Sequence, residues 1–385
     1  MSPQPKTHNQ QPATRNGFSP FRIPNSAFPI LPPPPPSRGR DGVGGIFRIP
    51  HSAFRIFVLW GLILLFFIPS LSSAQDAPLF RQSRILMGTS AEISVSQAAP
   101  KKAEDALEAA FQEMERINVL MSHYRPDSEV SRIARFAGQK EIRVSPETLE
   151  VIERALYFSR LSGGALDVTI GSVFRLWNFR EGKIPDARSL RENLKRVDYR
   201  KIKVDRAGSS VFLENTGMEL DLGAIAKGYA VDLACAVLRK KGMESFLVKL
   251  GGEIKAHGEK EPGVPWIVGI QHPRLSSLLL AKLQVRNAAI STSGDYEKFF
   301  LQGGERYHHI LDPSTGMPAQ ECQSVTILAP SSMDADALAT TVFVLGPRKG
   351  FSLIEKLPGV HAVVVDRRGS VLTSPDWPAG VLLPP

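Results

Sequence analysis

The stretch at residues 219–242 constrains the fold most, because it combines a short apolar run, a glycine and a predicted helix. Apolar residues recur along it at helical spacing, so one face of this helix is predicted to pack against a core. These residues are Ala226, Ala230, Leu233, Ala234, Val237 and Leu238. A cationic run at residues 239–241 falls in the last predicted turn, and Gly242 follows where a helix typically ends.

The start of this helix has the features of an anion-binding site. Asp221 and Gly223 lead into the helix, and Lys227 is expected one turn inside it. The first turn of a helix presents unpaired backbone N–H groups and the positive end of the helix dipole, and a lysine adds a full charge. The Gly-x4-Gly-Lys-Ser/Thr spacing of a P-loop is absent. The stretch therefore predicts either a phosphate site of another kind or an ordinary helix with a surface lysine.

Length and charge bound the class of protein. The chain has 385 residues, 43% of them hydrophobic and 22% charged, which is typical of a globular protein with a real core. Its formal net charge is +9, but seven of the 47 Lys and Arg residues and one of the 38 acids lie in residues 1–74. The remainder holds 40 basic and 37 acidic residues, so a nucleic-acid-binding surface is not supported. Cys235 and Cys322 make no disulfide framework, and Cys235 is expected in the core.

The N-terminal part is predicted to be a leader rather than part of the fold. Residues 1–55 are rich in Pro, Gly, Ser and Asn and cannot bury a core, so we expect disorder there. Residues 56–74 hold thirteen residues of which only Gly61 is not strongly apolar, then small residues at Ser72 and Ala74. This pattern is typical of a secretory signal and is short for a membrane span. No cysteine follows directly to carry a lipid anchor, so we expect export to the periplasm or cell envelope through the signal alone.

The chain beyond residue 74 alternates antiparallel runs of strands with a few long helices, which favours an α+β fold over a doubly wound sheet. No Pro- or Gly-rich linker follows, so we expect one compact unit of one or two lobes. Besides the helix that ends at residues 239–241, helices are expected at residues 103–121, 129–136, 146–161 and 333–345, the last with Asp334 as its N-cap. Strands are expected at residues 84–95 with a turn at Gly88, 200–220 as a hairpin, 246–250, 266–271, 279–286, 289–292, 310–312, 324–329 and 360–366.

Two residues near the C-terminus have the chemistry of cation ligands. Asp336 and Thr340 are four apart on a predicted helix, so a carboxylate and a hydroxyl project from one face. This pair predicts either a magnesium site or an acid that only favours the helix dipole. His308 and His309 lie at a predicted strand end near Asp312, where a histidine is usually structural. No Cys/His cluster has zinc spacing and no Gly-x-Gly-x-x-Gly pattern is present, so zinc chemistry and a Rossmann site are disfavoured.

Eight motifs in consistent order resemble those of the ApbE family of FAD:protein FMN transferases, over residues 84–373. They are MGTSAEISV, MSHYRPDSEVSRI, GGALDVTIG followed by LWNF, ELDLGAIAKGYAVD, LGGEI, ISTSGDYEKFF, HHILDPSTG and DADALATTVFVLG. Each motif alone is weakly specific, and the ordered set is highly specific. Glu253 stands where the family usually has aspartate, and the lipid-anchor cysteine of the lipoprotein members is missing.

The resemblance implies a T-fold-like α+β architecture, with antiparallel sheets, packed helices and FAD in a cleft between two lobes. Carried over to this chain, FAD would be held by Met87, Tyr124, Ala165, Leu166, Asp167, Asp221, Lys227 and Leu311. Tyr124 would be a stacking platform. Mg²⁺ would be held between the two phosphates by the main-chain carbonyl of Ala224 and the side chains of Asp336 and Thr340. His309 would be the catalytic residue near the attacking hydroxyl.

The implied activity is magnesium-dependent transfer of FMN from FAD to a threonine hydroxyl of a client protein, which forms a phosphoester-linked flavin and releases AMP. The family implies a client target site of the form Asp-Gly-x-Thr/Ser-x-Ala-Thr, on an exported or membrane redox protein. Two alternatives stay open. In an FAD hydrolase, water replaces the client hydroxyl; a flavin-binding protein performs no turnover. The binding protein needs no cation ligands, so Asp336 and Thr340 disfavour it.

Overall fold

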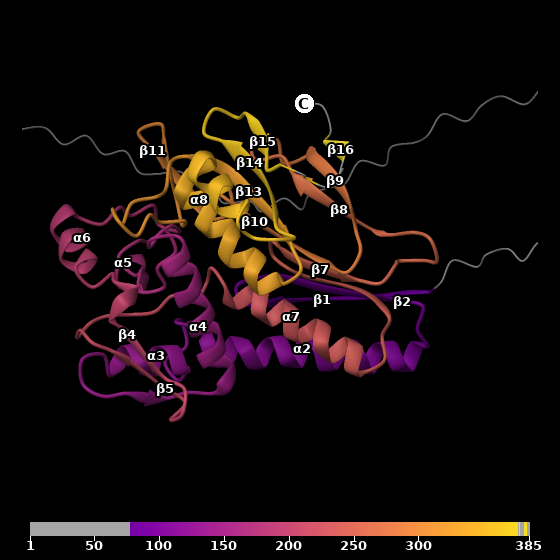
Figure 1. The fold of residues 1–385 in the computed structure, drawn as a ribbon, viewed down its shortest axis with the longest axis horizontal. Coiled ribbons are helices and arrows are strands. Elements are labelled where there is room, and N and C mark those ends of the chain that lie inside the picture. The colour runs from indigo at the N-terminus through magenta and orange to yellow at the C-terminus, as the bar shows by residue number, and fades with distance from the viewer. Residues whose placement is uncertain (1–77, 376, 378–380, 383–385) are drawn as a thin grey trace, which may run out of the picture. The chain divides into compact units, whose positions relative to one another are not determined.

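The computed structural model describes residues 78–375, 377 and 381–382, and the expected leader and signal segments at residues 1–55 and 56–74 lie outside them. The largest sheet has eight strands, each antiparallel to its neighbours (Figure 1). In spatial order they are β1 (Leu79–Leu86), β2 (Thr89–Ser96), β6 (Ser245–Leu250), β7 (Glu253–His257), β10 (Ala288–Gly294), β13 (Cys322–Ala329), β14 (His361–Asp366) and β15 (Val371–Thr373). The α+β prediction is confirmed.

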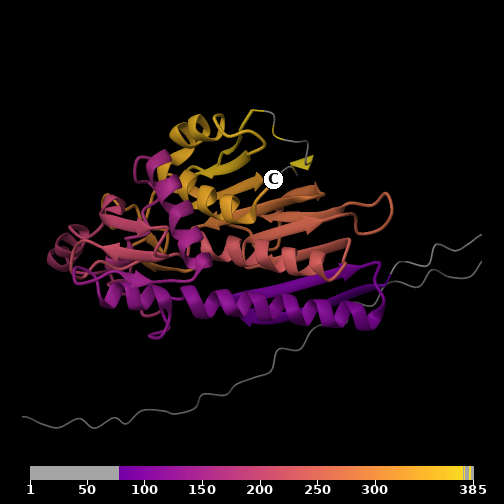
Figure 2. The same cartoon turned by 60° about the horizontal axis from the view of Figure 1, so that its bottom comes forward.

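Three long helices pack against this sheet: α2 (Pro100–Met121), α7 (Ala226–Lys240) and α8 (Ser332–Ile354). Figure 2 shows α2 and α7 running side by side. Their buried faces carry many alanines, among them Ala103, Ala106, Ala230 and Ala234, which are fully buried. Small side chains let helices approach closely, so these faces bury the two helices against each other as well as against the strands.

A smaller antiparallel sheet forms a second layer with the large one. Its strands are β8 (Trp266–Gln271), β9 (Leu279–Val285) and β16 (Val381–Leu382), in the order β16-β9-β8. Side chains of β8 alternate strictly between buried and exposed, as expected for a strand with one face on a core. Trp266, Val268 and Ile270 join one apolar cluster with Ile290 and Val363 of the large sheet.

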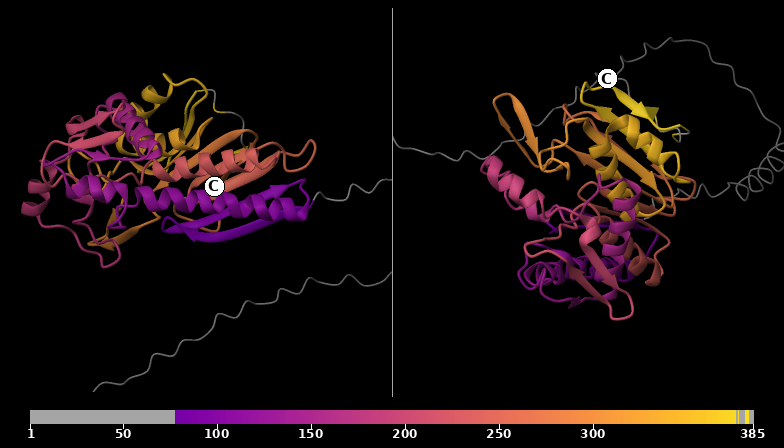
Figure 3. Two further views of the ribbon diagram at one scale, coloured as in Figure 1. Left: turned by 90° about the horizontal axis from the view of Figure 1, so that it is seen from below. Right: turned by 60° about the vertical axis from the view of Figure 1, so that its left-hand side comes forward.

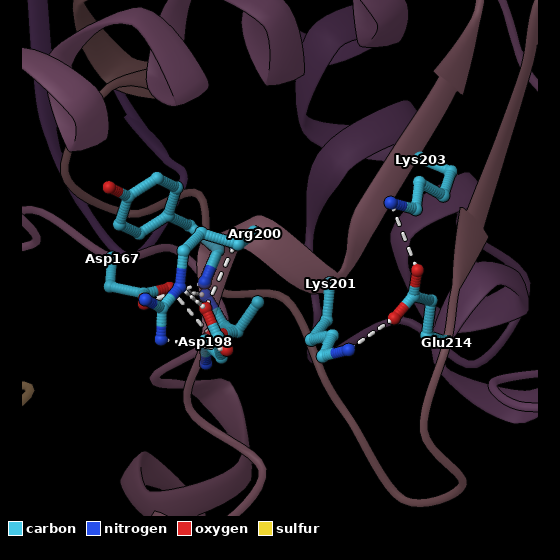
Figure 4. Close-up of polar contacts among 8 residues, drawn as sticks. Asp167, Asp198, Arg200, Lys201, Lys203 and Glu214 are labelled. Atoms are coloured by element: carbon cyan, nitrogen blue, oxygen red, sulfur yellow. Dashed lines mark hydrogen bonds and ion pairs between the residues drawn. The ribbon is translucent and has the colours of Figure 1, made fainter.

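Most of the remaining elements form the part of the molecule beside α2. They comprise α3 (Glu129–Arg135), β3 (Ile142–Arg143), α4 (Pro146–Leu161), α5 (Gly171–Phe174), α6 (Ala187–Leu194), η2 (Tyr199–Lys201), β4 (Ile202–Asp205) and β5 (Ser210–Leu213). α4 begins as predicted, since Ser145 caps it and Pro146 occupies its first position. β4 pairs with β5 in the predicted hairpin, and Glu214 beside it accepts ion pairs from Lys201 and Lys203 at 2.7 and 3.0 Å (Figure 4).

A two-stranded hairpin, β11 (Phe299–Gln302) and β12 (Glu305–His308), lies outside the large sheet (Figure 3). Aromatic rings hold it to the α5–α6 region. Trp177 and Phe179 stack with ring centroids 5.4 Å apart, and Phe300 stacks on Tyr307 at 5.2 Å. This cluster fixes the chain that leaves β12 at His308 and continues to His309.

The structure corrects several local predictions. Ser331, not Asp334, is the N-cap of α8, and its side chain accepts the amide of Asp334. The helix expected to end at residue 345 does end there, because Gly346 has a non-helical backbone (φ 75°, ψ 170°), and a second helical segment then continues the element labelled α8 to Ile354. Residues 310–312 form only an isolated bridge through Leu311 rather than a strand. Residues 84–95 belong to two strands, joined at the predicted turn.

Both cysteines are buried and free, which confirms Cys235 as a core residue. Across the residues that the structure describes, no helix has both the length and the apolar character needed to cross a membrane.

Gly228 marks a close approach of α7 to α8. A Cβ built on Gly228 would lie 2.2 Å from the carbonyl oxygen of Ser332 and 2.8 Å from Cβ of Asp336. We therefore expect Gly228→Ala to push the helices apart and to lower the free energy of unfolding by about 1–3 kcal/mol, the usual cost of overpacking. Urea unfolding measures this, with Arg239→Ala, an exposed position of the same helix, as a control that should change by less than about 0.5 kcal/mol. An unchanged unfolding free energy for Gly228→Ala would contradict the tight contact.

Candidate active site

One cavity of about 610 Å³ gathers all the residues that the resemblance assigned to a site. They come from distant parts of the chain: the β1–β2 turn, the end of α2, the loop before α5, the start of α7, the chain after β12, and α8. The predicted residues that line it are Met87, Tyr124, Ala165, Leu166, Asp167, Asp221, Ala224, Lys227, His309, Leu311, Asp336 and Thr340. The structure therefore brings the predicted set together, and the individual roles stay predictions.

The rim of the cavity carries two unusual residues. Met87 and Gly88 form the two-residue turn between β1 and β2, both with positive φ, at 49° and 74°. This left-handed conformation is rare for a side chain such as methionine and tends to occur at functional sites. Tyr124 is 73% exposed, and its ring centroid lies 3.9 Å from that of His123. A large aromatic ring that faces solvent at the cavity is suited to the predicted stacking.

Asp167 is buried, and its carboxylate shapes the cavity wall through contacts within the fold. Oδ1 accepts the amide of Thr169 at 2.9 Å and Oδ2 accepts the amide of Tyr199 at 2.9 Å. Figure 4 shows Asp167 beside the Asp198–Arg200 pair, in which Arg200 Nε lies 2.7 Å from Asp198 Oδ1. Burial raises the pKa of Asp167, and these hydrogen bonds only partly offset that effect. The loop at residues 165–170 is therefore held in shape before any ligand arrives.

The start of α7 differs from the sequence prediction in one respect. The helix begins at Ala226, so Lys227 is its second residue rather than one turn inside. The amide of Gly228 is not free, because it donates to Oδ2 of Asp336 at 2.9 Å. A carboxylate from α8 thus occupies part of the helix N-terminus where free amides were expected to meet phosphate.

Three oxygen donors near this point fit a hard cation such as Mg²⁺. Asp336 is 2% exposed and Thr340 lies one turn further along α8, with Oγ1 3.3 Å from Oγ of Ser293. The Gly228 amide would bond to the Ala224 carbonyl if the helix continued one turn earlier, but it is directed to Asp336 instead. A carboxylate, a hydroxyl and a carbonyl match magnesium's preference for oxygen. No group of three or more His, Cys, Asp or Glu able to hold a metal occurs within the described ranges.

Glu253 is a site residue to which the sequence analysis assigned no role. Its Oε1 lies 2.6 Å from Nζ of Lys227, and its side chain is 4% exposed. Burial raises the pKa of Glu253 to about 7, although the ion pair with Lys227 opposes this shift. Burial lowers the pKa of Lys227, but the charges of Asp336 and Glu253 outweigh it, so that the net shift is upward and the ammonium stays charged.

The two neighbouring histidines face different surroundings, as the alternation along a strand predicts. His308 is buried, with Nε2 2.8 Å from the carbonyl oxygen of Ala319. His309 lines the cavity, and its Nδ1 is buried with no hydrogen-bond partner among the described residues. Burial, helped by the charge of Lys298, lowers the pKa of His309 to about 3. The imidazole is therefore neutral at physiological pH.

His123 forms an acid–imidazole pair that the sequence analysis missed. Its Nδ1 lies 3.3 Å from Oδ1 of Asp221, and both residues line the cavity. Burial alone would lower the pKa of His123, but the hydrogen bond and charge of Asp221 outweigh it and raise the pKa. The same pairing lowers the pKa of Asp221 against the effect of its burial.

Further lining residues come from the motif ISTSGDYEKFF, for which no roles were predicted. They include Thr292, Ser293, Glu297 and Lys298. The amide of His309 donates to the carbonyl of Lys298 at 3.1 Å, so this segment also positions the histidine. The only available signal was the motif itself, since nothing local distinguishes these polar residues from a solvated turn.

The chain is similar in sequence to known proteins. The family model described as "ApbE family" matches residues 87–364. A Treponema pallidum protein named FAD:protein FMN transferase is 38% identical over 305 residues, which cover 74% of this chain and 84% of that protein. A protein of the same name from Vibrio cholerae is 36% identical, over 66% of this chain and 78% of that protein.

Solved structures show the same fold. The crystal structure of the ApbE protein from Thermotoga maritima has a TM-score of 0.72 at 32% identity, covering 77% of this chain and 97% of that one. The structure of flavin transferase ApbE from Vibrio cholerae has a TM-score of 0.70 at 32% identity, covering 79% and 100%. Family match, sequence identity and fold agree over most of the described chain, and the protein therefore belongs to the ApbE family.

Proposed function

We propose that this protein is an enzyme that transfers FMN from FAD to a hydroxyl group of a client protein. The observation that carries the proposal is that a single cavity holds an oxygen donor set for a cation, a half-buried ammonium and a neutral imidazole. Transfer of a phosphoryl-type group needs mainly positioning and charge stabilisation, which these groups supply. The relatives' name, FAD:protein FMN transferase, states transfer of FMN from FAD to a protein, and the hydroxyl acceptor is part of the proposal.

The cavity has features for each part of FAD. Its volume of about 610 Å³ is within the usual range for small-molecule sites, roughly 300–1,000 Å³. Tyr124 offers a ring for stacking, and the apolar side chains of Leu166 and Leu311 line the wall. Lys227 and Lys298 bring positive charge to the same cavity, which favours the pyrophosphate.

In the proposed reaction the client hydroxyl oxygen attacks the phosphorus on the FMN side of the pyrophosphate. A new P–O bond forms, the P–O bond to the AMP phosphate breaks, and AMP leaves with the bonding electrons. His309 accepts or orients the proton of the attacking hydroxyl, because its neutral imidazole lines the cavity. Asp336, Thr340 and the Ala224 carbonyl would hold Mg²⁺. When bound, the cation neutralises charge that develops on the phosphates.

The client residue is proposed to be a threonine on an exported or membrane redox protein, and the enzyme is proposed to act in the periplasm or cell envelope. The support is the family resemblance and the signal-like pattern at residues 56–74. This segment lies outside the described residues.

Client mass tests the function. The protein is incubated with FAD, Mg²⁺ and an exported protein that carries an Asp-Gly-x-Thr/Ser-x-Ala-Thr site. We expect the client to gain one FMN group with loss of water, and one AMP to appear for each client modified. A client with valine at the acceptor position should gain nothing. Release of FMN and AMP with an unmodified client would support the hydrolase instead, and retention of intact FAD would support a binding protein.

A further inference from the structure

Lys227 lies between two buried carboxylates on the cavity wall. Its Nζ is 2.6 Å from Oε1 of Glu253 and 3.4 Å from Oδ1 of Asp336. The side chains of these two acids are 4% and 3% exposed. β7 supplies Glu253, α7 supplies Lys227 and α8 supplies Asp336. One ammonium therefore joins three elements at the point where the cation ligands meet.

The two carboxylates differ in what else holds them. Oδ2 of Asp336 accepts the Gly228 amide at 2.9 Å, which fixes this side chain independently of Lys227. Oε1 of Glu253 has a second, long contact of 3.5 Å to Oγ of Ser291. Oε2 of Glu253 is buried and has no hydrogen-bond partner within the described part of the chain. Lys227 is thus the main partner of Glu253. Glu253 is also the main partner of Lys227, because Nζ lies closer to Oε1 of Glu253 (2.6 Å) than to Oδ1 of Asp336 (3.4 Å).

The balance of charge explains why this matters for a cation. With Glu253 ionised, two carboxylates face one ammonium, so one negative charge is left over. Without the charge of Glu253, the ammonium would cancel the charge of Asp336. It would also be free to move onto Oδ1 of Asp336, an oxygen that a divalent cation needs as a ligand. Both effects act against cation binding.

We infer that Glu253 is a positioning residue that holds Lys227 away from Asp336 and so keeps Asp336 available to a divalent cation. The inference rests on the proposed function for the presence of the cation site. Glu253 itself would not bind the cation and would act on it through Lys227. Residues that orient or balance metal ligands in this way commonly change metal affinity by about 10–100-fold when they are replaced.

Two binding measurements on Glu253→Gln test this without any turnover. At pH 8.5, where Glu253 is ionised in the unmodified protein, calorimetric titration with Mg²⁺ alone should show an affinity about 10–100-fold weaker in the variant. FAD titrated in EDTA should bind the variant at least as tightly as the unmodified protein. The second result is expected because Lys227, once released from Glu253, has its full charge available to phosphate. General damage to the fold would instead weaken the binding of both Mg²⁺ and FAD.

Matched variants separate the role of Glu253 from a merely structural one. Glu253→Asp keeps the charge and should retain most of the Mg²⁺ affinity. A second lysine–carboxylate pair also joins β7 to α7: Nζ of Lys255 lies 2.6 Å from Oδ1 of Asp232. Lys255→Gln removes this pair. Lys255 does not line the cavity, so this variant should bind Mg²⁺ and FAD as the unmodified protein does.

The outcomes distinguish the inference from the proposed function. Unchanged Mg²⁺ affinity in Glu253→Gln, or parallel losses for Mg²⁺ and FAD, would overturn the role of Glu253 and leave the cation site intact. An unmodified protein that binds FAD but no Mg²⁺ would instead overturn the cation site itself. Weaker Mg²⁺ binding with undiminished FAD binding supports the inference.

Discussion

Asp336→Asn is expected to slow FMN transfer by at least about 10³-fold, since cation stabilisation of a phosphoryl transition state contributes several kcal/mol and each 1.36 kcal/mol is tenfold in rate. Asparagine keeps the shape of the side chain and an oxygen that can accept the Gly228 amide, now bonded to Oδ2 at 2.9 Å. It removes the negative charge that a divalent cation requires. The loss should therefore come from the chemistry and not from the fold.

The rate is measured as AMP release at saturating FAD and Mg²⁺. Asp334→Asn is the matched control, because Asp334 lies on the same helix, does not line the cavity and pairs with Arg154 at 2.7 and 2.6 Å. This control should keep its transfer rate. A normal rate in Asp336→Asn, or activity of the unmodified protein that survives EDTA, would contradict the magnesium role.

Asparagine is a better replacement than alanine, for a reason that the sequence did not reveal. If Asp336 were an exposed acid on the helix surface, its replacement by alanine would leave the stability of the fold unchanged. The structure instead buries it at 2% exposure and bonds it to a backbone amide. Alanine would leave the Gly228 amide without its partner, which costs about 1–3 kcal/mol for a buried donor. A slow Asp336→Ala enzyme could then be slow because it is partly unfolded.

His309→Ala is expected to slow transfer by about 10²-fold, the lower end of the usual range for general acid–base help. Burial and Lys298 hold the pKa of His309 to about 3, so the neutral imidazole can accept a proton but is a weak base. FAD affinity should change little, because the proposed role is on the attacking group. Single-turnover kinetics measure the effect on the transfer rate, and FAD titration measures the effect on FAD affinity. A loss of FAD affinity that accounts for the whole defect would make His309 a structural residue of the cavity.

His308→Ala is the informative comparison, but it tests stability and not chemistry. His308 bonds to the Ala319 carbonyl and packs against Phe343 with ring centroids 5.4 Å apart. We expect a lower free energy of unfolding and, under conditions where the variant is folded, a transfer rate close to normal. A rate loss equal to that of His309→Ala in fully folded protein would contradict the assignment.

The pH dependence of kcat/KM follows from the same environments, because this parameter reports the free enzyme. His309 stays neutral down to about pH 3, so it should contribute no limb between about pH 5 and 9. A limb near neutral pH would belong to His123, whose pKa Asp221 raises, or to Glu253, with a pKa of about 7. His123→Asn should remove the first of these without abolishing FAD binding.

Much of the fold followed from local patterns. α4 was predicted at its observed bounds, because Ser145 and Pro146 mark its start and the glycine pair at residues 163–164 follows its end. The helix expected at residues 103–121 lies within α2, whose apolar residues recur at helical spacing from Ala103 to Met121 and are buried. Less regular signals failed: Asp334 resembles an N-cap, but Ser331 precedes it and takes that place. Residues 310–312 are apolar enough for a strand but have no neighbouring strand to pair with in the described fold.

By itself the sequence determined the α+β class, most elements and, through the ordered motifs, all twelve predicted residues that line the cavity. Only the tertiary structure decided the electrostatics. The Lys227–Glu253 pair, the buried state of Asp336 and the lowered pKa of His309 each depend on groups from other elements. Periodicity reports which face of an element is apolar, whereas burial and charge at one atom depend on whatever the rest of the chain places beside it.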